Sequence, residues 1–304
     1  MHSDDPDYWC VADALTPELH GGRSVCVSQY LAKQLQQQVG ATKPLVIPCG
    51  IALPLGLTSF SDQPFRVVYS GRMVERQKCI HQVVQALILA CEASSQIEAL
   101  LFGDGPARSA CEQLVHQAGF ADRIRFYGRV PPDQVQWYLQ SSQAILLMSE
   151  FEGLPVALLE AMATGVVPVV RAIDSGIPEL VQHERTGLLV TNDPAQAASA
   201  LVRLCREPQL WHQCSTQART HVQNSYNSEH CVQRWMELIQ EAREPVPLSF
   251  PIDKLNFRKE LPWGDLRFQA HYTPSPSRWS KLRPRRLIGR LRRMAVGHSP
   301  SEGS

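Results

Sequence analysis

Residues 144–172 read AILLMSEFEGLPVALLEAMATGVVPVVRA and hold a strand, a loop, a helix and a second strand in one stretch. The two ends, 144–149 and 166–172, are short apolar runs of strand length. Between them, residues 154–163 are mostly strong helix formers, and Pro155 suits the first position of a helix because its missing N–H costs nothing there. This pattern predicts a strand–helix–strand unit of a parallel sheet.

The loop and helix of this unit carry two carboxylates eight positions apart, Glu152 and Glu160. Gly153 lets the backbone approach a ligand, and the amides around Gly153 and Leu154 are expected to point at an anion near the helix N-terminus. Glu160 lies in the second turn and leans back toward that end, so both carboxylates can face one pocket and accept sugar hydroxyls. The stretch therefore predicts a sugar-nucleotide site. The alternative is that Glu152 complements the helix dipole and Glu160 is a solvated surface residue.

The same alternation extends over residues 65–242, where six short apolar runs each precede a helical pattern. Six strand–helix repeats predict an α/β fold with a doubly wound, mostly parallel, Rossmann-like sheet. Such sheets bind ligands beyond the carboxyl ends of their strands. The candidate residues all follow strands: Gly71 and Arg72, Gly103 and Gly105, Gly128, Arg129 and Val130, Glu152 and Gly153. The GDGP turn at 103–106 lacks the third glycine of a dinucleotide fingerprint, so a tight turn that opens the next helix explains it equally well.

Composition divides the chain into three parts. Residues 1–55 contain a strand–helix–strand pattern that is too small to close a core of its own. Residues 56–244 form the complete repeat domain. Residues 245–304 are rich in proline and basic residues, and we expect them to be largely irregular.

The overall composition is that of a globular protein of 304 residues, with 44% apolar and 19% charged residues. The acidic start MHSDDPDYWC resembles neither a secretory signal nor a transit peptide. The nine cysteines are scattered and never spaced as C-x-x-C, which favours reduced thiols in a cytoplasmic protein. No two histidines have convincing metal-ligand spacing, which argues against a metal site, and we expect no cofactor.

Seven segments, taken in order, resemble the retaining glycosyltransferases of the two-domain GT-B fold, in the large family-four group (glycosyl transferases group 1) that uses nucleotide-sugar donors. The resemblance covers residues 25–240. The segments are VCVSQYLAKQL (25–35), VIPCGI (46–51), VVYSGRMVERQKCI (67–80), LLFGDGP (100–106), IRFYGRV (124–130), SEFEGLPVALLEAMATGVVPVV (149–170) and DSGIPELVQHERTGLLV (174–190).

The resemblance implies a role for each matching residue. Arg72 and Lys78, after Gly71, contact the donor diphosphate, and fixed cations there stabilise the charge that develops on the leaving group. Glu160 binds the ribose hydroxyls, and Glu152 lies near the sugar and the proximal phosphate. The Gly153 and Leu154 amides complete the phosphate cradle, while the backbone at Arg129 and Val130 borders the base. The expected catalytic residues are Arg72, Lys78 and Glu152, without a metal and with the nucleotide sugar as substrate.

The resemblance also implies an acceptor-binding first domain, of which residues 1–55 match only the last part and the hinge. Cys49 and Ala52 stand where the hinge usually has asparagine and aspartate. The chain is therefore expected to transfer a sugar, with retention, to a hydroxyl of a glycan or lipid-linked acceptor in polysaccharide biosynthesis. Transfer is then expected to need a separate polypeptide that supplies the acceptor domain; without such a partner, the chain is a fragment with no transfer activity. The alternative is a noncatalytic nucleotide-sugar-binding or assembly subunit, or an inactive fragment; an epimerase of the same fold fits the glutamate pair less well.

The tail has a charge of its own. Eight of the 30 basic residues lie between Arg278 and Arg293, where there is no acidic residue, and the remaining 22 basic and 29 acidic residues leave the rest of the chain at −7. Leu287, Ile288, Leu291 and Met294 share one helical face, as in an interfacial helix that holds a protein at the inner membrane face. A disordered basic tail explains the composition equally well, and limited aromatic content argues against nucleic acid.

Overall fold

The structure, a computed structural model, describes residue 1, residues 24–40 and residues 43–241. The predicted irregular tail lies outside these residues. The first part has the predicted strand–helix–strand order, with β1 (Val25–Cys26), α2 (Gln29–Val39) and β2 (Leu45–Val46). β1 and β2 pair in parallel, and Ser28 caps α2 by accepting the Leu31 amide at 3.2 Å.

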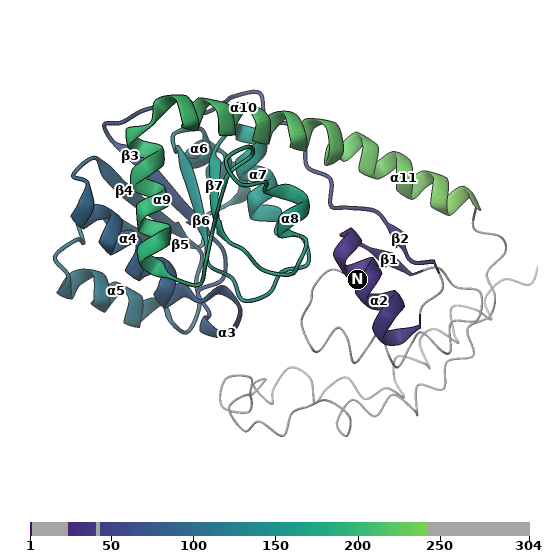
Figure 1. The fold of residues 1–304 in the computed structure, drawn as a ribbon, viewed down its shortest axis with the longest axis horizontal. Coiled ribbons are helices and arrows are strands. Elements are labelled where there is room, and N and C mark those ends of the chain that lie inside the picture. The colour runs from purple at the N-terminus through teal and green to yellow at the C-terminus, as the bar shows by residue number, and fades with distance from the viewer. Residues whose placement is uncertain (2–23, 41–42, 242–304) are drawn as a thin grey trace, which may run out of the picture. The chain divides into compact units, whose positions relative to one another are not determined.

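A six-stranded sheet follows, and every neighbouring pair in it is parallel. The spatial order is β5-β4-β3-β6-β7-β8. This confirms the predicted doubly wound, Rossmann-like α/β fold (Figure 1). The strands are β3 (Phe65–Ser70), β4 (Ile97–Phe102), β5 (Ile124–Gly128), β6 (Ala144–Leu147), β7 (Val167–Arg171) and β8 (Leu188–Val190).

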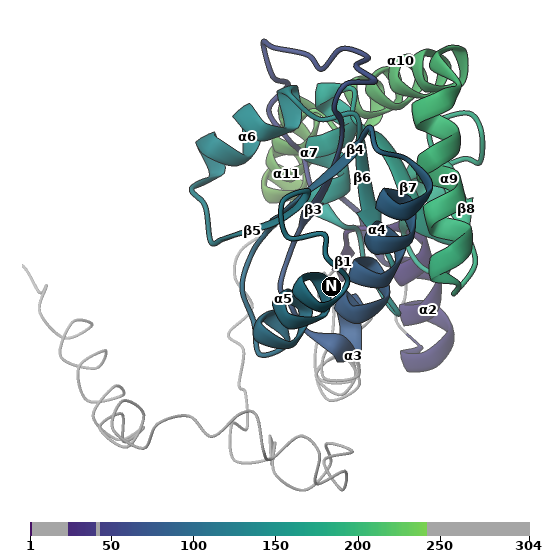
Figure 2. The same ribbon diagram turned by 90° about the vertical axis from the view of Figure 1, so that its left-hand side faces the viewer.

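Helices cover both faces of the sheet, with α4 and α9 on one side and α6 and α7 on the other (Figure 2). The sequence patterns did not single out α10 and α11. The helices are α3 (Glu75–Lys78), α4 (Ile80–Ala93), α5 (Arg108–Gln117), α6 (Pro132–Gln140), α7 (Val156–Thr164), α8 (Ile177–Leu180), α9 (Pro194–Arg206), α10 (Pro208–Ser225) and α11 (Ser228–Glu241).

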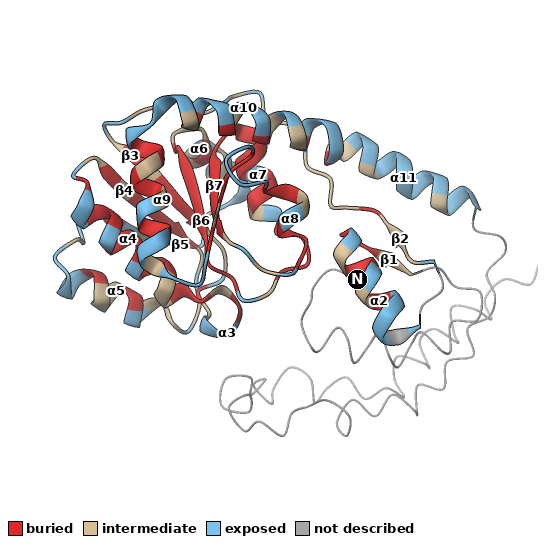
Figure 3. Cartoon of the chain, in the orientation of Figure 1, coloured by how far each residue is buried: buried red, intermediate tan, exposed pale blue. Residues whose placement is uncertain are grey.

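The core lies between the sheet and these helical layers, and the strands are mostly buried except for the edge strand β5 (Figure 3). All four residues of β6 are buried, which explains its continuous apolar sequence, because a parallel sheet covered on both faces needs no polar alternation. α4 buries Ile80, Val83 and Leu87 on one face. Each such side chain contributes about 1.5–3 kcal/mol to folding.

The order of the strands locates the functional edge. The chain runs outward from β3 to β4 and β5 and then returns to β6, on the other side of β3. The carboxyl ends of β3 and β6 therefore meet where the strand order reverses, which is where open parallel sheets bind ligands. The loops that leave these two strands, residues 71–74 and 148–155, carry most of the predicted site residues.

Candidate functional site

A buried glutamine joins the two loops at the strand-order reversal. Gln77 is 8% exposed, and its side-chain oxygen accepts a hydrogen bond from the Arg72 guanidinium. Its amide nitrogen donates to the Phe151 carbonyl at 3.3 Å, and its own carbonyl accepts the Glu150 amide at 2.8 Å. Gln77 thus fixes Arg72 beside the loop after β6. The sequence does not predict this role, because Gln77 lies in a polar helical stretch and looks like an ordinary surface residue there.

Lys78 and Glu152 form an ion pair in the same place. Their side chains are only 14% and 7% exposed, so each charge depends on the other for compensation. Cys79 follows in the left-handed conformation (φ 47°) and separates α3 from α4. The ammonium group has two further N–H donors for a ligand.

Gly153 and Leu154 are buried, yet their amides donate to no described residue. α7 begins directly afterwards at Val156, so Pro155 is its N-cap residue, whereas the sequence predicts this proline at the first helical position. The hydroxyl of Ser149, 1% exposed, also has no hydrogen-bond partner in the described part of the chain. Buried polar groups are nearly always paired, so this cluster indicates a place for a polar ligand.

Glu160 lies on the outer side of α7, whereas its neighbours Leu159 and Ala161 are buried. The side chain is exposed overall, but nearby protein reduces the hydration of its carboxyl group, and this burial raises its pKa. The carboxylate pairs with no described residue. An unpaired, partly dehydrated carboxylate remains able to accept ligand hydroxyls.

The glycines after β3 and β4 serve loop packing. Gly103 adopts φ 123°, and a Cβ there would lie 1.8 Å from the Gly71 carbonyl oxygen; a Cβ on Gly105 would lie 2.3 Å from that of Met73. The Gly71 amide also donates to the Phe102 carbonyl at 3.0 Å. The GDGP turn therefore supports the Gly71 loop from behind, as the tight-turn interpretation expects.

Arg129 and Val130 follow β5, two strands from β3 in the sheet. Arg129 is exposed and Val130 is half-buried against the core. No described hydrogen bond joins them to Arg72, Lys78 or Glu152. Printed contacts thus connect Arg72, through Gln77, to the loop after β6 and join Lys78 to Glu152. Among the described residues, no hydrogen bond or ion pair joins the side chains of Glu160, Arg129 or Val130 to this group.

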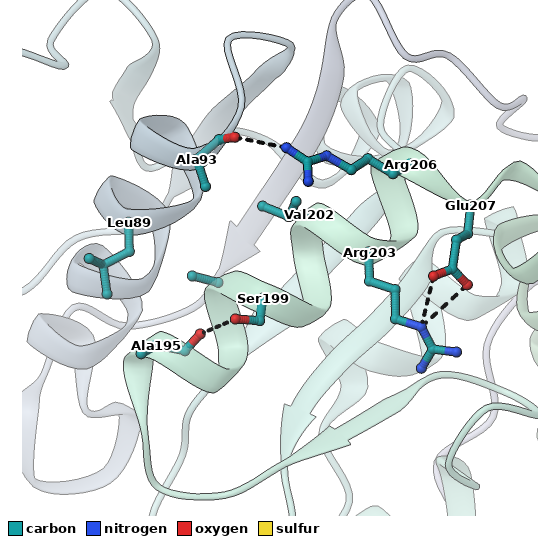
Figure 4. Close-up of a pocket in the computed structure, with 9 residues that line it drawn as sticks. Leu89, Ala93, Ala195, Ser199, Val202, Arg203, Arg206 and Glu207 are labelled. Carbon is teal, nitrogen blue, oxygen red and sulfur yellow. Dashed lines mark hydrogen bonds and ion pairs between the residues drawn. The ribbon is translucent and has the colours of Figure 1, made fainter.

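A separate groove lies between α4 and α9, and none of its lining residues belongs to the predicted site (Figure 4). Its charged groups are already paired: Arg206 donates to the Ala93 carbonyl at 3.1 Å, and Arg203 binds Glu207 at 3.2 Å. The described residues contain no cluster of side chains suited to a metal ion. Within the same residues, no helix combines the length and apolar character that crossing a membrane requires.

Comparison with known proteins shows that the repeat domain is similar to glycosyltransferases. Residues 64–207 match the family model "Glycosyl transferases group 1". The chain is 29% identical over 193 residues to the amylovoran biosynthesis glycosyltransferase AmsK of Erwinia amylovora, covering 61% of this chain and 47% of AmsK. It is 35% identical over 160 residues to N-acetyl-alpha-D-glucosaminyl L-malate synthase of Bacillus anthracis, covering 52% of this chain and 41% of that enzyme.

The fold is also similar to that of solved structures. S. aureus TarM, crystallised as a mutant in complex with Fondaparinux, alpha-GlcNAc-glycerol and UDP, superposes with a TM-score of 0.68 at 16% identity. The match covers 78% of this chain and 49% of TarM. The chain thus spans less than half the length of the two curated relatives and about half of TarM. Residues 64–207 are thus similar to the glycosyl transferases group 1 family, and the described sheet is the Rossmann-like domain of the GT-B fold.

Proposed function

We propose that this chain binds a nucleoside diphosphate sugar and is the donor-binding part of a retaining glycosyltransferase of the hexosyltransferase type. The acceptor is a hydroxyl of a glycan or of a lipid-linked sugar. The observation that carries the proposal is the buried amide pair of Gly153 and Leu154 before α7, which no described residue pairs, together with the Lys78 ammonium that binds the adjacent Glu152. Free amides, a helix N-terminus and a cation together suit a diphosphate.

Each residue then has a chemical task. Lys78 and Arg72 stabilise the negative charge that develops on the diphosphate as the glycosidic bond breaks, and they do so more strongly than in the ground state. Glu152, held by Lys78, lies beside the sugar, and Glu160 accepts hydrogen bonds from the ribose. The acceptor hydroxyl attacks the face from which the diphosphate leaves, and a phosphate oxygen takes its proton, so no side-chain nucleophile is required.

The relatives support this assignment and suggest the first donors to test. AmsK is named as a glycosyltransferase of amylovoran biosynthesis, and the TarM complex contains UDP and alpha-GlcNAc-glycerol. We therefore expect a uridine nucleotide as the first candidate. The Arg129 and Val130 backbone would border the base.

Calorimetric titration of the chain with uridine, guanosine and adenosine diphosphate sugars tests the proposal. We expect saturable binding of one base class, lost in Glu160→Ala and in Lys78→Ala and retained in Glu229→Ala, an exposed helical glutamate of α11. Failure to bind any donor, or equal affinity in all variants, contradicts the site. Binding without transfer to any acceptor supports the noncatalytic alternative.

A further inference from the structure

The N-terminus of α2 is capped by a residue from a distant part of the chain. The Glu179 carboxylate accepts the Gln29 amide at 3.0 Å and the Tyr30 amide at 2.9 Å, one on each oxygen. Ser28 accepts the third amide, that of Leu31. The first three N–H groups of α2 are therefore satisfied, two of them by a side chain about 150 positions away.

The electrostatics of this contact are favourable. The first turn of α2 contains no acidic residue of its own, so Glu179 supplies the negative charge that the positive end of the helix dipole favours. Hydrogen bonds to an ionised acceptor are also stronger than neutral ones. The pairing thus holds α2 to α8, the short helix that contains Glu179.

α10 fixes the backbone of Glu179 from the other side. His221 Nε2 lies 2.7 Å from the Glu179 carbonyl oxygen, and the Tyr226 hydroxyl donates to the same oxygen at 3.5 Å. Tyr226 is 7% exposed and belongs to the core. The carboxylate is therefore presented to α2 by an anchored segment.

The same segment touches the proposed phosphate cradle. A Cβ on Gly176 would lie 2.0 Å from the Gly153 carbonyl oxygen and 3.1 Å from the Ser28 Cβ. Ser28, Gly176 and Gly153 thus lie in successive contact, and any shift of α2 away from α8 removes the support behind Gly153. Ser28 is fully buried, which agrees with close packing.

We propose that Glu179 is a positioning residue for donor binding: by capping α2 it keeps Ser28 and Gly176 packed behind Gly153, so that the Gly153 and Leu154 amides stay aimed at the donor phosphates. Residues 24–40 thereby contribute to the donor site without contacting the donor. This inference rests on the proposed function of that site.

The test compares two helix-capping carboxylates in the full chain. Glu179→Ala removes the cap of α2, and Asp193→Ala removes the cap of α9, where Asp193 accepts the Ala195 amide at 2.9 Å away from the site. Both variants lose stability to a similar extent because both lose a helix cap. We expect the Kd for UDP to rise about tenfold in Glu179→Ala, as the loss of one charge-assisted hydrogen bond implies, and to stay unchanged in Asp193→Ala.

Hydrogen exchange without nucleotide supplies a second readout. In Glu179→Ala, exchange should accelerate in residues 29–31 and also in residues 149–158, whereas Asp193→Ala should alter neither segment. If Glu179→Ala fails to fold, Glu179→Gln, which keeps one acceptor oxygen, replaces it, with a smaller shift in the same direction. Unchanged exchange in 149–158, or an equal loss of affinity in both alanine variants, overturns the proposal. If the wild-type chain binds no nucleotide, the proposed function fails, whereas the exchange result still decides whether Glu179 keeps residues 149–158 packed.

Discussion

At the residue scale, the ion pair of Lys78 and Glu152 determines what a substitution costs. Lys78→Ala leaves the nearly buried Glu152 carboxylate without its partner, so we expect a loss of about 3–5 kcal/mol in the free energy of unfolding. The double variant Lys78→Met with Glu152→Gln should lose much less, because no uncompensated charge is left. Urea denaturation of the wild type, Lys78→Met, Glu152→Gln and the double variant measures the coupling. Additive losses would contradict a buried, mutually dependent pair.

Glu160 should lower the folding stability at neutral pH while it strengthens donor binding. Burial raises the pKa of Glu160 in the folded chain, so the folded chain holds the carboxyl proton more tightly than the unfolded chain does. The protonated side chain therefore favours folding at low pH, and this contribution is lost as the pH rises through the folded pKa. Glu160→Gln should therefore match the wild type in acid and exceed it in stability at neutral pH, while binding donor less tightly. Thermal unfolding at several pH values checks the first part and calorimetry the second. A variant that is less stable than the wild type at neutral pH would refute this account.

Gly176 gives the sharpest steric prediction. Its φ of −72° suits any residue, so the cost of alanine there is steric: its Cβ would lie 2.0 Å from the Gly153 carbonyl oxygen and 3.1 Å from the Ser28 Cβ. Backbone must move, and we expect Gly176→Ala to lose both stability and affinity for UDP. Gly119→Ala is the control: its φ of 78° imposes strain of about 1 kcal/mol, but nothing lies within 4 Å. The control should lose stability alone, and retained UDP affinity in Gly176→Ala would count against the packing behind Gly153.

Residue types predicted part of this site. Glu152, Gly153 and Glu160 stand out because a charged pair and a glycine interrupt an apolar run. Gln77 and Glu179 do not, because their roles depend on partners 74 and 149–150 positions away. Neither spacing nor composition contains that information.

At the element scale, local periodicity was sufficient for the strands and for most helices. The six predicted runs became the six strands, and the inner ones are mostly apolar because strands covered on both faces need no polar alternation. The edge strand β5 instead alternates buried and more exposed residues. α10 was missed, although Trp211, Cys214, Ala218 and Val222, its buried residues, recur at helical spacing. The strand order is set by packing among all the elements, and the sequence patterns did not predict it.

α11 carries the next prediction. Val232, Trp235, Met236 and Ile239 share one helical face and are 40–61% exposed, and no residue of this helix is buried in the described structure. An apolar face of this kind favours association, so we expect the purified chain to self-associate as its concentration rises. Trp235→Ser with Ile239→Ser should reduce the sedimentation coefficient at high concentration, whereas Glu229→Ala should not. Equal sedimentation of all three would exclude α11 from the interface.

At the scale of the whole molecule, charge is divided unevenly, with +8 over residues 278–293 and −7 over the remainder. Each basic residue near an anionic membrane contributes about 1 kcal/mol to the binding free energy. We therefore expect the chain to bind vesicles that contain phosphatidylserine and not to bind neutral vesicles. Replacing Arg285, Arg286, Arg292 and Arg293 by Gln should abolish flotation with vesicles while leaving UDP affinity unchanged, because the donor-site residues lie elsewhere.

Salt separates the two interpretations of that tail. Screening at 1 M salt shortens the Debye length to about 3 Å and removes purely electrostatic binding. An interfacial helix also inserts Leu287, Ile288 and Leu291, whose apolar burial does not depend on salt. Residual flotation at high salt that is lost in Leu287→Ser with Leu291→Ser therefore identifies membrane insertion. Complete release by salt identifies a nonspecific basic tail, and binding to neutral vesicles would contradict the electrostatic argument altogether.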